Sequence, residues 1–327
     1  MKAKHLLLIT AVLLVIALAG CRAASGAPAP VSPAVPTSTP FPTVTPAPTP
    51  TPIASAPFER FDGGRAFAHV EAQMAFGPRP TGSEAAQQTA AYILAELERM
   101  GWTAERQPFE YQDVAAQNLI GRAGSEGGPV LLVGAHYDTR RRADRDPATP
   151  EQPVPGANDG ASGVAVLLEL ARVLNLTAVD GEVWLVFFDA EDNGGLDGWD
   201  WIAGSTYFAG NMSVTPEYLI LVDMIGDADQ NLYYERNSDV VLMQHLWEIA
   251  ANMGYGEYFI PTVNHSILDD HIPFLQQGIP AVDIIDFDYP YWHTTQDTVD
   301  KVSPDSLERV GRVIEAFLET GGAYPGP

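Results

Sequence analysis

The chain has 327 residues, of which 46% are hydrophobic, and this is enough for one large domain with its own core. Its formal net charge is −24 at pH 7, and this acidic balance argues against a nucleic-acid-binding protein. The charge favours solubility, and it also favours substrates that carry a positively charged amino end. Cys21 is the single cysteine, so no disulfide can form within the chain.

Residues 1–20 have the pattern of a secretion signal. Lys2 and Lys4 precede an apolar run over residues 6–19, which is shorter than a membrane span requires. Small residues end this run directly before Cys21, and the arrangement resembles the signal of bacterial lipoproteins, in which the cysteine is lipidated. The resemblance implies a lipid anchor at Cys21 and a location in the bacterial cell envelope, outside the cytoplasm. The alternative is an ordinary signal peptide or a short anchor, with an incidental cysteine.

Residues 21–57 are dominated by Pro, Thr, Ala and Ser, and the pair Thr-Pro occurs four times. Proline at this density keeps a chain extended and prevents a packed core. We interpret this segment as a tether, and we place the folded catalytic domain at residues 58–323.

The folded part alternates between helical and strand patterns. Apolar periodicity, with Ser83 and Ser303 as N-caps and Gly101 after a helix end, predicts the boundaries. Helices are predicted over residues 58–76, 84–100, 164–174, 240–253 and 303–320, with a short helical segment opening within 268–274. Strands are predicted over 103–111, 118–122, 130–135, 183–188, 218–223 and 281–285. Apolar strands that alternate with helices predict a single α/β domain with a mostly parallel central sheet and helices on both faces.

Acidic residues and histidines gather at or just after the ends of these strands. They are His136, Asp138, Asp159, Glu191, Asp192, Asp223 and His293. In open α/β sheets, ligands bind at the carboxyl ends of the strands. Imidazole and carboxylate groups are zinc ligands, whereas the only thiol of the chain lies in the signal. Each residue alone has an ordinary structural explanation, but together they predict a metal enzyme.

The predicted strand over 183–188 is followed by the densest acidic cluster. The cluster consists of Asp189, Glu191 and Asp192, and buried carboxylates are costly unless a cation or a proton accompanies them. Because Glu191 and Asp192 are adjacent, one can bind a metal while the other faces the substrate as a general base. We interpret Asp189 as structural support.

Several motifs together resemble the zinc aminopeptidase and glutaminyl cyclase superfamily over about residues 58–320. The motifs are Gly77-Pro-Arg-Pro-Thr-Gly-Ser83, His136-Tyr-Asp138, Asn158-Asp159-Gly160, Glu191-Asp192, Asp223 and His293-Thr294, and they occur in the order of that family. The resemblance implies an α/β/α fold like that of the zinc exopeptidases, with peptide or protein N-termini as substrates.

The two branches of the superfamily imply different roles for the same residues. In two-zinc aminopeptidases, His136 and Asp223 would hold one zinc, Asp192 and His293 the other, and Asp159 would bridge them, with Glu191 as general base and Asp138 orienting His136. In glutaminyl cyclases, a single zinc would be held by Asp159, Asp192 and His293. Glu191 would then transfer a proton from the α-amine of the substrate, Asp223 and Asp269 would form a hydrogen-bond network, and His136 would not be a ligand.

Details of the sequence favour the cyclase branch. Asp269 precedes Asp270-His271, the segments 225–226 and 272–275 are similar to the cyclases, and Trp292 directly precedes His293 as in the pocket wall of that branch. One departure concerns Asp192, because both branches usually carry Glu there. The shorter side chain requires a metal closer to the backbone, or a shifted loop.

The resulting hypothesis is a zinc enzyme, with one or two zinc ions, that converts N-terminal glutamine to pyroglutamate with release of ammonia. The alternative is a zinc aminopeptidase that hydrolyses N-terminal residues. A third reading is an inactive binding module at the cell surface, and the presence of Glu191 together with all the metal-binding positions argues against it.

Overall fold

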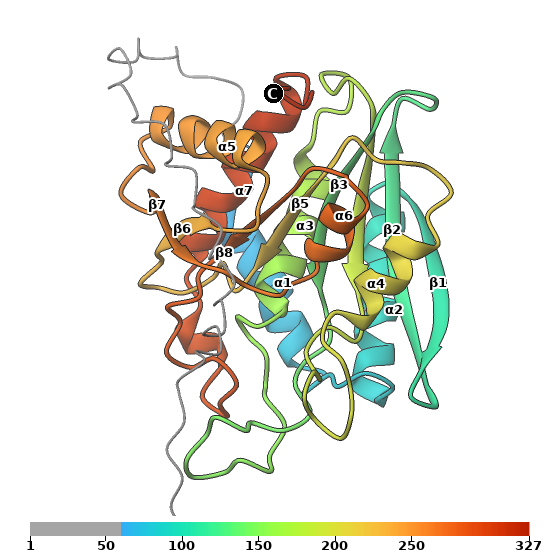
Figure 1. The fold of residues 1–327 in the computed structure, drawn as a ribbon, viewed down its shortest axis with the longest axis vertical. Helices are drawn as coiled ribbons and strands as arrows, with labels where there is room; N and C mark the ends of the chain where they lie inside the picture. Colours follow the sequence, from blue (N-terminus) through green and yellow to red (C-terminus); the bar gives the residue numbers. More distant parts are fainter. Residues whose placement is uncertain (1–59, 327) are drawn as a thin grey trace, which may run out of the picture. The chain divides into compact units, whose positions relative to one another are not determined.

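A six-stranded sheet forms the centre of residues 60–326, the part of the chain that the computed structural model describes (Figure 1). Its strands are β1 (Thr103–Tyr111), β2 (Val114–Gly124), β3 (Val130–His136), β4 (Glu182–Phe188), β5 (Tyr218–Asp223) and β8 (Ala281–Ile285). The order is β1-β2-β4-β3-β5-β8. The neighbouring strands β4, β3, β5 and β8 run parallel to one another. β2 pairs antiparallel with β4, and β1 pairs antiparallel with β2 at the edge of the sheet. The mostly parallel α/β sheet predicted from the sequence is therefore confirmed.

Helices cover both faces of this sheet. One face packs against α1 (Gly63–Met74), α2 (Glu84–Arg99), α3 (Ala161–Val173) and α7 (Pro304–Glu319), and the other against α4 (Ala203–Gly210) and α6 (Ile272–Gln276). Alternate residues of each strand point to opposite faces. Thus Leu131 and Val133 of β3 join the core under α3, whereas Leu132 joins Phe208 and Phe274 in the core under α4 and α6. This explains why the central strands are apolar at nearly every position.

A smaller two-stranded parallel sheet lies beside the main sheet. It consists of β6 (Leu232–Glu235) and β7 (Phe259–His265), and α5 (Val240–Asn252) connects its strands. A short 3₁₀ helix, η1 (Val299–Lys301), precedes α7. The sequence analysis predicted α5 but missed α4, β6 and β7. These elements are short, and Pro261 within β7 weakens its strand pattern.

Three predicted boundaries need correction. The first helix begins at Gly63, because the Asp62 carboxylate accepts the N–H groups of Gly64 and Arg65 as an N-cap. The helix predicted from residue 164 already begins at Ala161. The strand predicted over 118–122 covers Val114–Gly124, because a tight turn with positive φ at two residues ends β1 and starts β2 at once.

No helix within residues 60–326 is long and apolar enough to cross a membrane. The predicted signal peptide, the lipidation site at Cys21 and the tether over 21–57 lie outside the described residues. They therefore stay predictions.

Candidate active site

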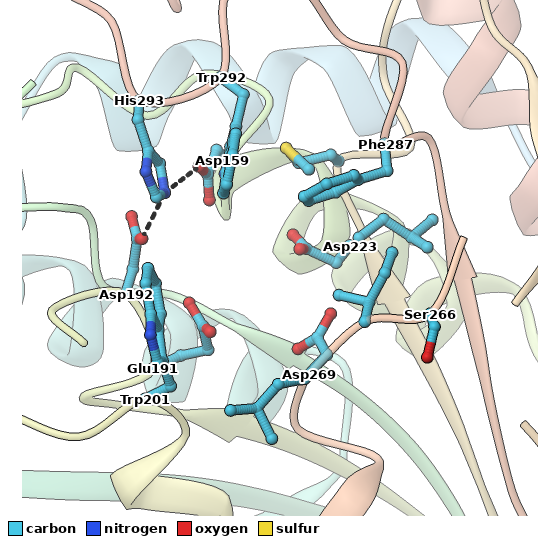
Figure 2. Close-up of a pocket in the computed structure, with 14 residues that line it drawn as sticks. Asp159, Glu191, Asp192, Trp201, Asp223, Ser266, Asp269, Phe287, Trp292 and His293 are labelled. Carbon is cyan, nitrogen blue, oxygen red and sulfur yellow. Dashed lines mark ion pairs between the residues drawn. The ribbon is translucent and has the colours of Figure 1, made fainter. Parts of the chain in front are cut away.

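The carboxyl ends of β3, β4, β5 and β8 meet at one edge of the sheet, and the predicted site residues meet with them. His136 ends β3, Asp223 ends β5, and the Glu191–Asp192 pair follows β4. Asp159 comes from the loop before α3, and His293 from the loop after β8. Figure 2 shows the pocket at this edge. It is lined by Asp159, Glu191, Asp192, Trp201, Asp223, Met224, Ser266, Ile267, Leu268, Asp269, Ile285, Phe287, Trp292 and His293.

One candidate metal-binding group consists of Asp159, Asp192 and His293. One ligand atom from each residue lies within 4.8 Å of the other two, and all three residues are buried. The Nε2 atom of His293 is 2.9 Å from Oδ1 of Asp192 and 3.8 Å from Oδ2 of Asp159. Figure 2 marks both contacts. The Asp192 carboxylate thus reaches the His293 ring although its side chain is shorter than that of glutamate.

A second group consists of His136, Asp159 and Asp223. The Nε2 atom of His136 is 3.0 Å from Oδ1 of Asp223 and 3.2 Å from Oδ1 of Asp159. The two oxygens of Asp159 therefore face different histidines, Oδ1 toward His136 and Oδ2 toward His293. His136 does not line the pocket, and it is 1% exposed beneath it.

The residues present fit a zinc ion. Tetrahedral zinc with nitrogen and oxygen ligands needs ligand atoms roughly 3.3–3.6 Å apart, and the distances given above fall close to that spacing. Oδ2 of Asp159 and Oδ2 of Asp192 are buried and lack a hydrogen-bond partner in the described structure. Such atoms are costly unless a ligand satisfies them. The site is compatible with one ion or with two that share Asp159.

Asp138 and Arg140 hold the loop that carries Glu191 and Asp192. The Asp138 carboxylate accepts the backbone N–H groups of Glu191 at 3.0 Å and Asp192 at 3.3 Å. The Arg140 guanidinium donates to the carbonyl oxygen of Asp192 at 2.9 Å. Asp138 was predicted to orient His136, and its Oδ1 lies 3.6 Å from the Nδ1 of that ring. Its hydrogen bonds to the loop are a role that the sequence analysis did not foresee.

Asp297 holds the loop that carries Asp159 through hydrogen bonds to its backbone. The sequence analysis did not predict this residue. Its carboxylate accepts the backbone N–H groups of Asn158 at 2.9 Å and Asp159 at 3.2 Å, and also the hydroxyl of Tyr289 at 2.7 Å. The peptide bond between Asp159 and Gly160 is cis. An aspartate four residues after a predicted ligand was the only available sequence signal, and it is too common to stand out.

Burial controls the ionisation of the site carboxyls. It raises the pKa of Glu191 well above the usual range, and it raises the pKa of Asp192 to about 6 and that of Asp223 to about 7. Burial also acts against the charge of Asp159, but the hydrogen bond with His136 leaves its pKa below the usual value. A cation bound among these groups would favour the ionised form of each.

Four non-glycine residues next to the site adopt the left-handed backbone region. They are Ala190, Ile202, Met224 and His293, with φ values of 58°, 56°, 44° and 58°. Ala190 precedes Glu191, and Met224 follows Asp223. Such conformations are strained and persist where the surrounding packing holds them, and they direct the neighbouring carboxylates and the His293 ring toward the pocket.

Comparison with known proteins identifies the family of this site. A model of peptidase family M28 matches residues 118–318, which is more than half of the chain and includes every candidate metal-binding residue named above. The chain belongs to peptidase family M28.

The relatives of this M28 chain come from both branches of the predicted superfamily. A glutaminyl cyclase from Tannerella forsythia is 36% identical, with a TM-score of 0.73 over 79% of this chain and 98% of that chain. A leucine aminopeptidase precursor from Bacteroides thetaiotaomicron VPI-5482 is 30% identical, with a TM-score of 0.75 over 80% and 98%. The glutaminyl-peptide cyclotransferase of Gloydius blomhoffii is 25% identical over 285 residues, 74% of this chain and 76% of that protein. These similarities support an enzyme of the cyclase or the aminopeptidase kind.

Aromatic rings form the walls of the M28 pocket. The Trp292 ring lies 3.9 Å from the His293 ring and 4.7 Å from the Phe287 ring, measured between centroids. Trp201, which the sequence analysis missed, stacks on the other side of the site at 5.9 Å from His293 with an angle of 9° between the planes. The pocket has a volume of about 210 Å³. It therefore has room for the first residue of a peptide.

Asp269 lines the same pocket, and a group of buried polar side chains lies behind it. The charge of Asp269 acts on the pKa of both Glu191 and Asp223. Behind Asp269, the Asp283 carboxylate lies 3.9 Å from Nδ1 of His271, whose Nε2 lies 3.3 Å from Glu235. The sequence analysis had assigned no role to Asp283 or Glu235.

Proposed function

We propose that this M28 enzyme is a zinc-dependent glutaminyl cyclase that converts N-terminal glutamine to pyroglutamate. The observation that carries the proposal is the set of groups in the pocket. Glu191, Asp223 and Asp269 face one small cavity with aromatic walls, beside a complete Asp159, Asp192 and His293 group. His136 stays outside the cavity, and its Nε2 contacts Asp223. This arrangement fits the cyclase resemblance, in which Asp159, Asp192 and His293 would hold one zinc and Asp223 and Asp269 would form a separate carboxylate network.

Cyclisation needs a proton to move between two nitrogens of the substrate. The α-amine nitrogen attacks the γ-carboxamide carbon, the bond from that carbon to the amide nitrogen breaks, and ammonia leaves. Glu191 lies in the pocket and is 7% exposed, so its carboxylate can accept the proton that the amine loses and give it to the departing nitrogen. No water is consumed. The rings of Trp201, Phe287 and Trp292 favour this outcome because they exclude water that would hydrolyse the amide.

Asp159, Asp192 and His293 would hold the zinc, and the hydrogen bonds from Asp138 and Asp297 would keep two of these ligands in place. When bound, zinc would supply positive charge beside the γ-amide carbonyl oxygen, where negative charge develops during attack. Asp223 and Asp269 would bind the α-amine and orient it toward the reacting carbon.

A second candidate function is that of a zinc aminopeptidase. One observation favours it, because the two oxygens of Asp159 face two histidines, and each histidine belongs to its own potential metal group. Two ions sharing Asp159 would suit hydrolysis of the first peptide bond, with Glu191 as general base for the attacking water.

A side-by-side assay separates the two functions. The purified protein is analysed for zinc per chain and is then supplied with glutaminyl and leucyl anilides. Cyclase activity predicts ammonia from the glutaminyl substrate and no free leucine from the leucyl one. Free leucine together with two zinc ions per chain would contradict the cyclase proposal and support the aminopeptidase.

We also propose that the enzyme is anchored to the bacterial cell envelope through a lipid on Cys21 and works outside the cytoplasm. The pattern of residues 1–21 supports this proposal. Metabolic labelling with a palmitate analogue tests it. Label is expected on the natural chain and not on the Cys21→Ala variant, so label that survives the substitution would overturn it.

A further inference from the structure

The loop between β3 and α3 carries an unusual concentration of positive charge for this acidic protein. Four of the 18 lysines and arginines lie within six residues, at positions 140, 141, 142 and 145. Three of the guanidinium groups stack on tryptophan rings of the site region. Arg140 lies 4.8 Å from the Trp201 ring, Arg141 lies 4.2 Å from the Trp199 ring, and Arg145 lies 3.9 Å from the Trp292 ring.

Most of this charge is already neutralised within the loop and its neighbours. Arg140 pairs with Asp144, and Arg141 and Arg142 both pair with Asp197. Arg145 differs from them. Arg145 is exposed, and no carboxylate of residues 60–326 forms an ion pair with it.

Arg145 packs against a wall residue of the pocket without lining the pocket itself. Its backbone N–H donates to the carbonyl oxygen of His293 at 3.3 Å, so this end of the loop is attached to the segment that carries a predicted metal ligand. Its guanidinium covers Trp292, a residue that lines the pocket. Within residues 60–326, the loop therefore presents one guanidinium without an ion-pair partner, and this group packs on a wall residue of a cavity whose interior is acidic.

We propose that Arg145 selects peptides that carry a carboxylate directly after their first residue. The proposal rests on the proposed action on peptide N-termini and adds a substrate preference to it. The acidic interior attracts the terminal ammonium group, and Arg145 attracts a negative charge on the part of the peptide that stays outside. The net charge of −24 repels acidic peptides from the rest of the surface, whereas Arg145 attracts them beside the pocket.

Two sources could supply this carboxylate. One is the side chain of Asp or Glu at the second position, and the other is the C-terminus of a dipeptide. Matched substrates separate them. Gln-Glu-Ala-amide and Gln-Ala-Ala-amide differ in the side-chain charge alone, whereas Gln-Ala and Gln-Ala-amide differ in the terminal charge alone.

The test is the ratio of kcat/KM between the charged and the neutral member of each pair. An exposed charge pair predicts a preference of about three- to fivefold for a charged member in the natural enzyme. Arg145→Ala should remove that preference, and Arg145→Glu should reverse it. Raising the salt concentration should weaken it, because exposed charges are screened. A preference in the first pair identifies the side chain as the source, and a preference in the second pair alone identifies the C-terminus.

Two further variants distinguish selection from simple support of the Trp292 ring. Arg145→Lys keeps the charge but loses the flat guanidinium surface, so it should retain most of the preference. If it behaves like Arg145→Ala, stacking rather than charge explains the effect and the proposal fails. Arg122 is the matched control, because it also stacks on a tryptophan, Trp184, at 3.9 Å, but outside the pocket. Arg122→Ala should leave the ratio as in the natural enzyme.

Failure of the catalytic proposal can be recognised separately. The same peptides are titrated calorimetrically against the Glu191→Gln variant, which is expected to bind without turnover. If binding shows the charge preference but the natural enzyme releases neither ammonia nor an amino acid, the proposed function is wrong and the role of Arg145 stands. Equal binding of charged and neutral peptides by this variant and by its combination with Arg145→Ala would overturn the role of Arg145.

Discussion

Asp297 offers a direct test of how the protein holds its metal-binding loop. The Asp297→Ala substitution removes the acceptor for the N–H groups of Asn158 and Asp159 and for the Tyr289 hydroxyl. Asp297 is fully buried, and its carboxylate holds the loop of Asp159 through the backbone N–H groups of Asn158 and Asp159. The substitution should therefore act on the metal through the position of Asp159.

The size of the effect follows from these hydrogen bonds. Each buried N–H group left without a partner costs about 1–3 kcal/mol, which gives about 2–6 kcal/mol for the two. Part of this cost is offset, because burial raises the pKa of Asp297 to about 7 and the buried carboxylate is itself costly. We expect a net loss of about 2–4 kcal/mol in the free energy of unfolding. Loss of a group that supports a metal ligand typically weakens metal binding by about 10- to 100-fold.

The assay combines denaturant unfolding with zinc competition against a chromophoric chelator. Asp239→Ala is the matched control, because Asp239 caps α5 by accepting the N–H of Leu242 at 2.9 Å and lies outside the pocket. That variant should lose about 1 kcal/mol and bind zinc as the natural protein does. Zinc affinity unchanged in Asp297→Ala would refute the view that this carboxylate positions Asp159.

Three further predictions concern proton transfer, burial and the metal. Glu191→Gln should abolish turnover while zinc per chain stays unchanged by elemental analysis, and loss of zinc would show that Glu191 rather than Asp192 is the ligand. Burial raises the pKa of Asp286 to about 7, so the folded state holds its proton more tightly than the unfolded state and stability falls as pH rises from about 4 to 7. Asp286→Asn should remove this fall, which amounts to at most about 4 kcal/mol, and parallel pH profiles for the two proteins would contradict the reasoning. Removing zinc with a chelator should lower the melting temperature, because the carboxylates of Asp159, Asp192 and Asp223 then lie buried without a cation, and an unchanged melting temperature would argue against a metal there.

The fold could be predicted from the sequence for the strands that are buried on both faces of the sheet. β4 and β5 are apolar at almost every position, and β5 was predicted with the boundaries that the structure shows, whereas β4 begins one residue before the predicted strand. Their ends then identified Glu191, Asp192 and Asp223, because polar residues that follow a buried strand must lie at the edge of the sheet.

The rest of the site depends on loop conformation, which local sequence patterns do not determine. Trp201 and Asp297 reach the site through turns whose course depends on contacts made far along the chain. The left-handed backbone of His293 is likewise set by tertiary packing, since no glycine indicates it. The contact of the Asp192 carboxylate with the His293 ring could not be predicted either, because it depends on how Asp138 and Arg140 hold the Asp192 backbone.

The central claim is that the pocket cyclises N-terminal glutamine. The most direct measurement follows one peptide, Gln-Ala-Ala-amide, with the zinc-loaded enzyme, by mass spectrometry of the product and a coupled assay for ammonia. The account predicts one ammonia for each peptide converted, a product lighter by the mass of one ammonia, and intact peptide bonds. Release of free glutamine with a shortened peptide, and no ammonia, would contradict it.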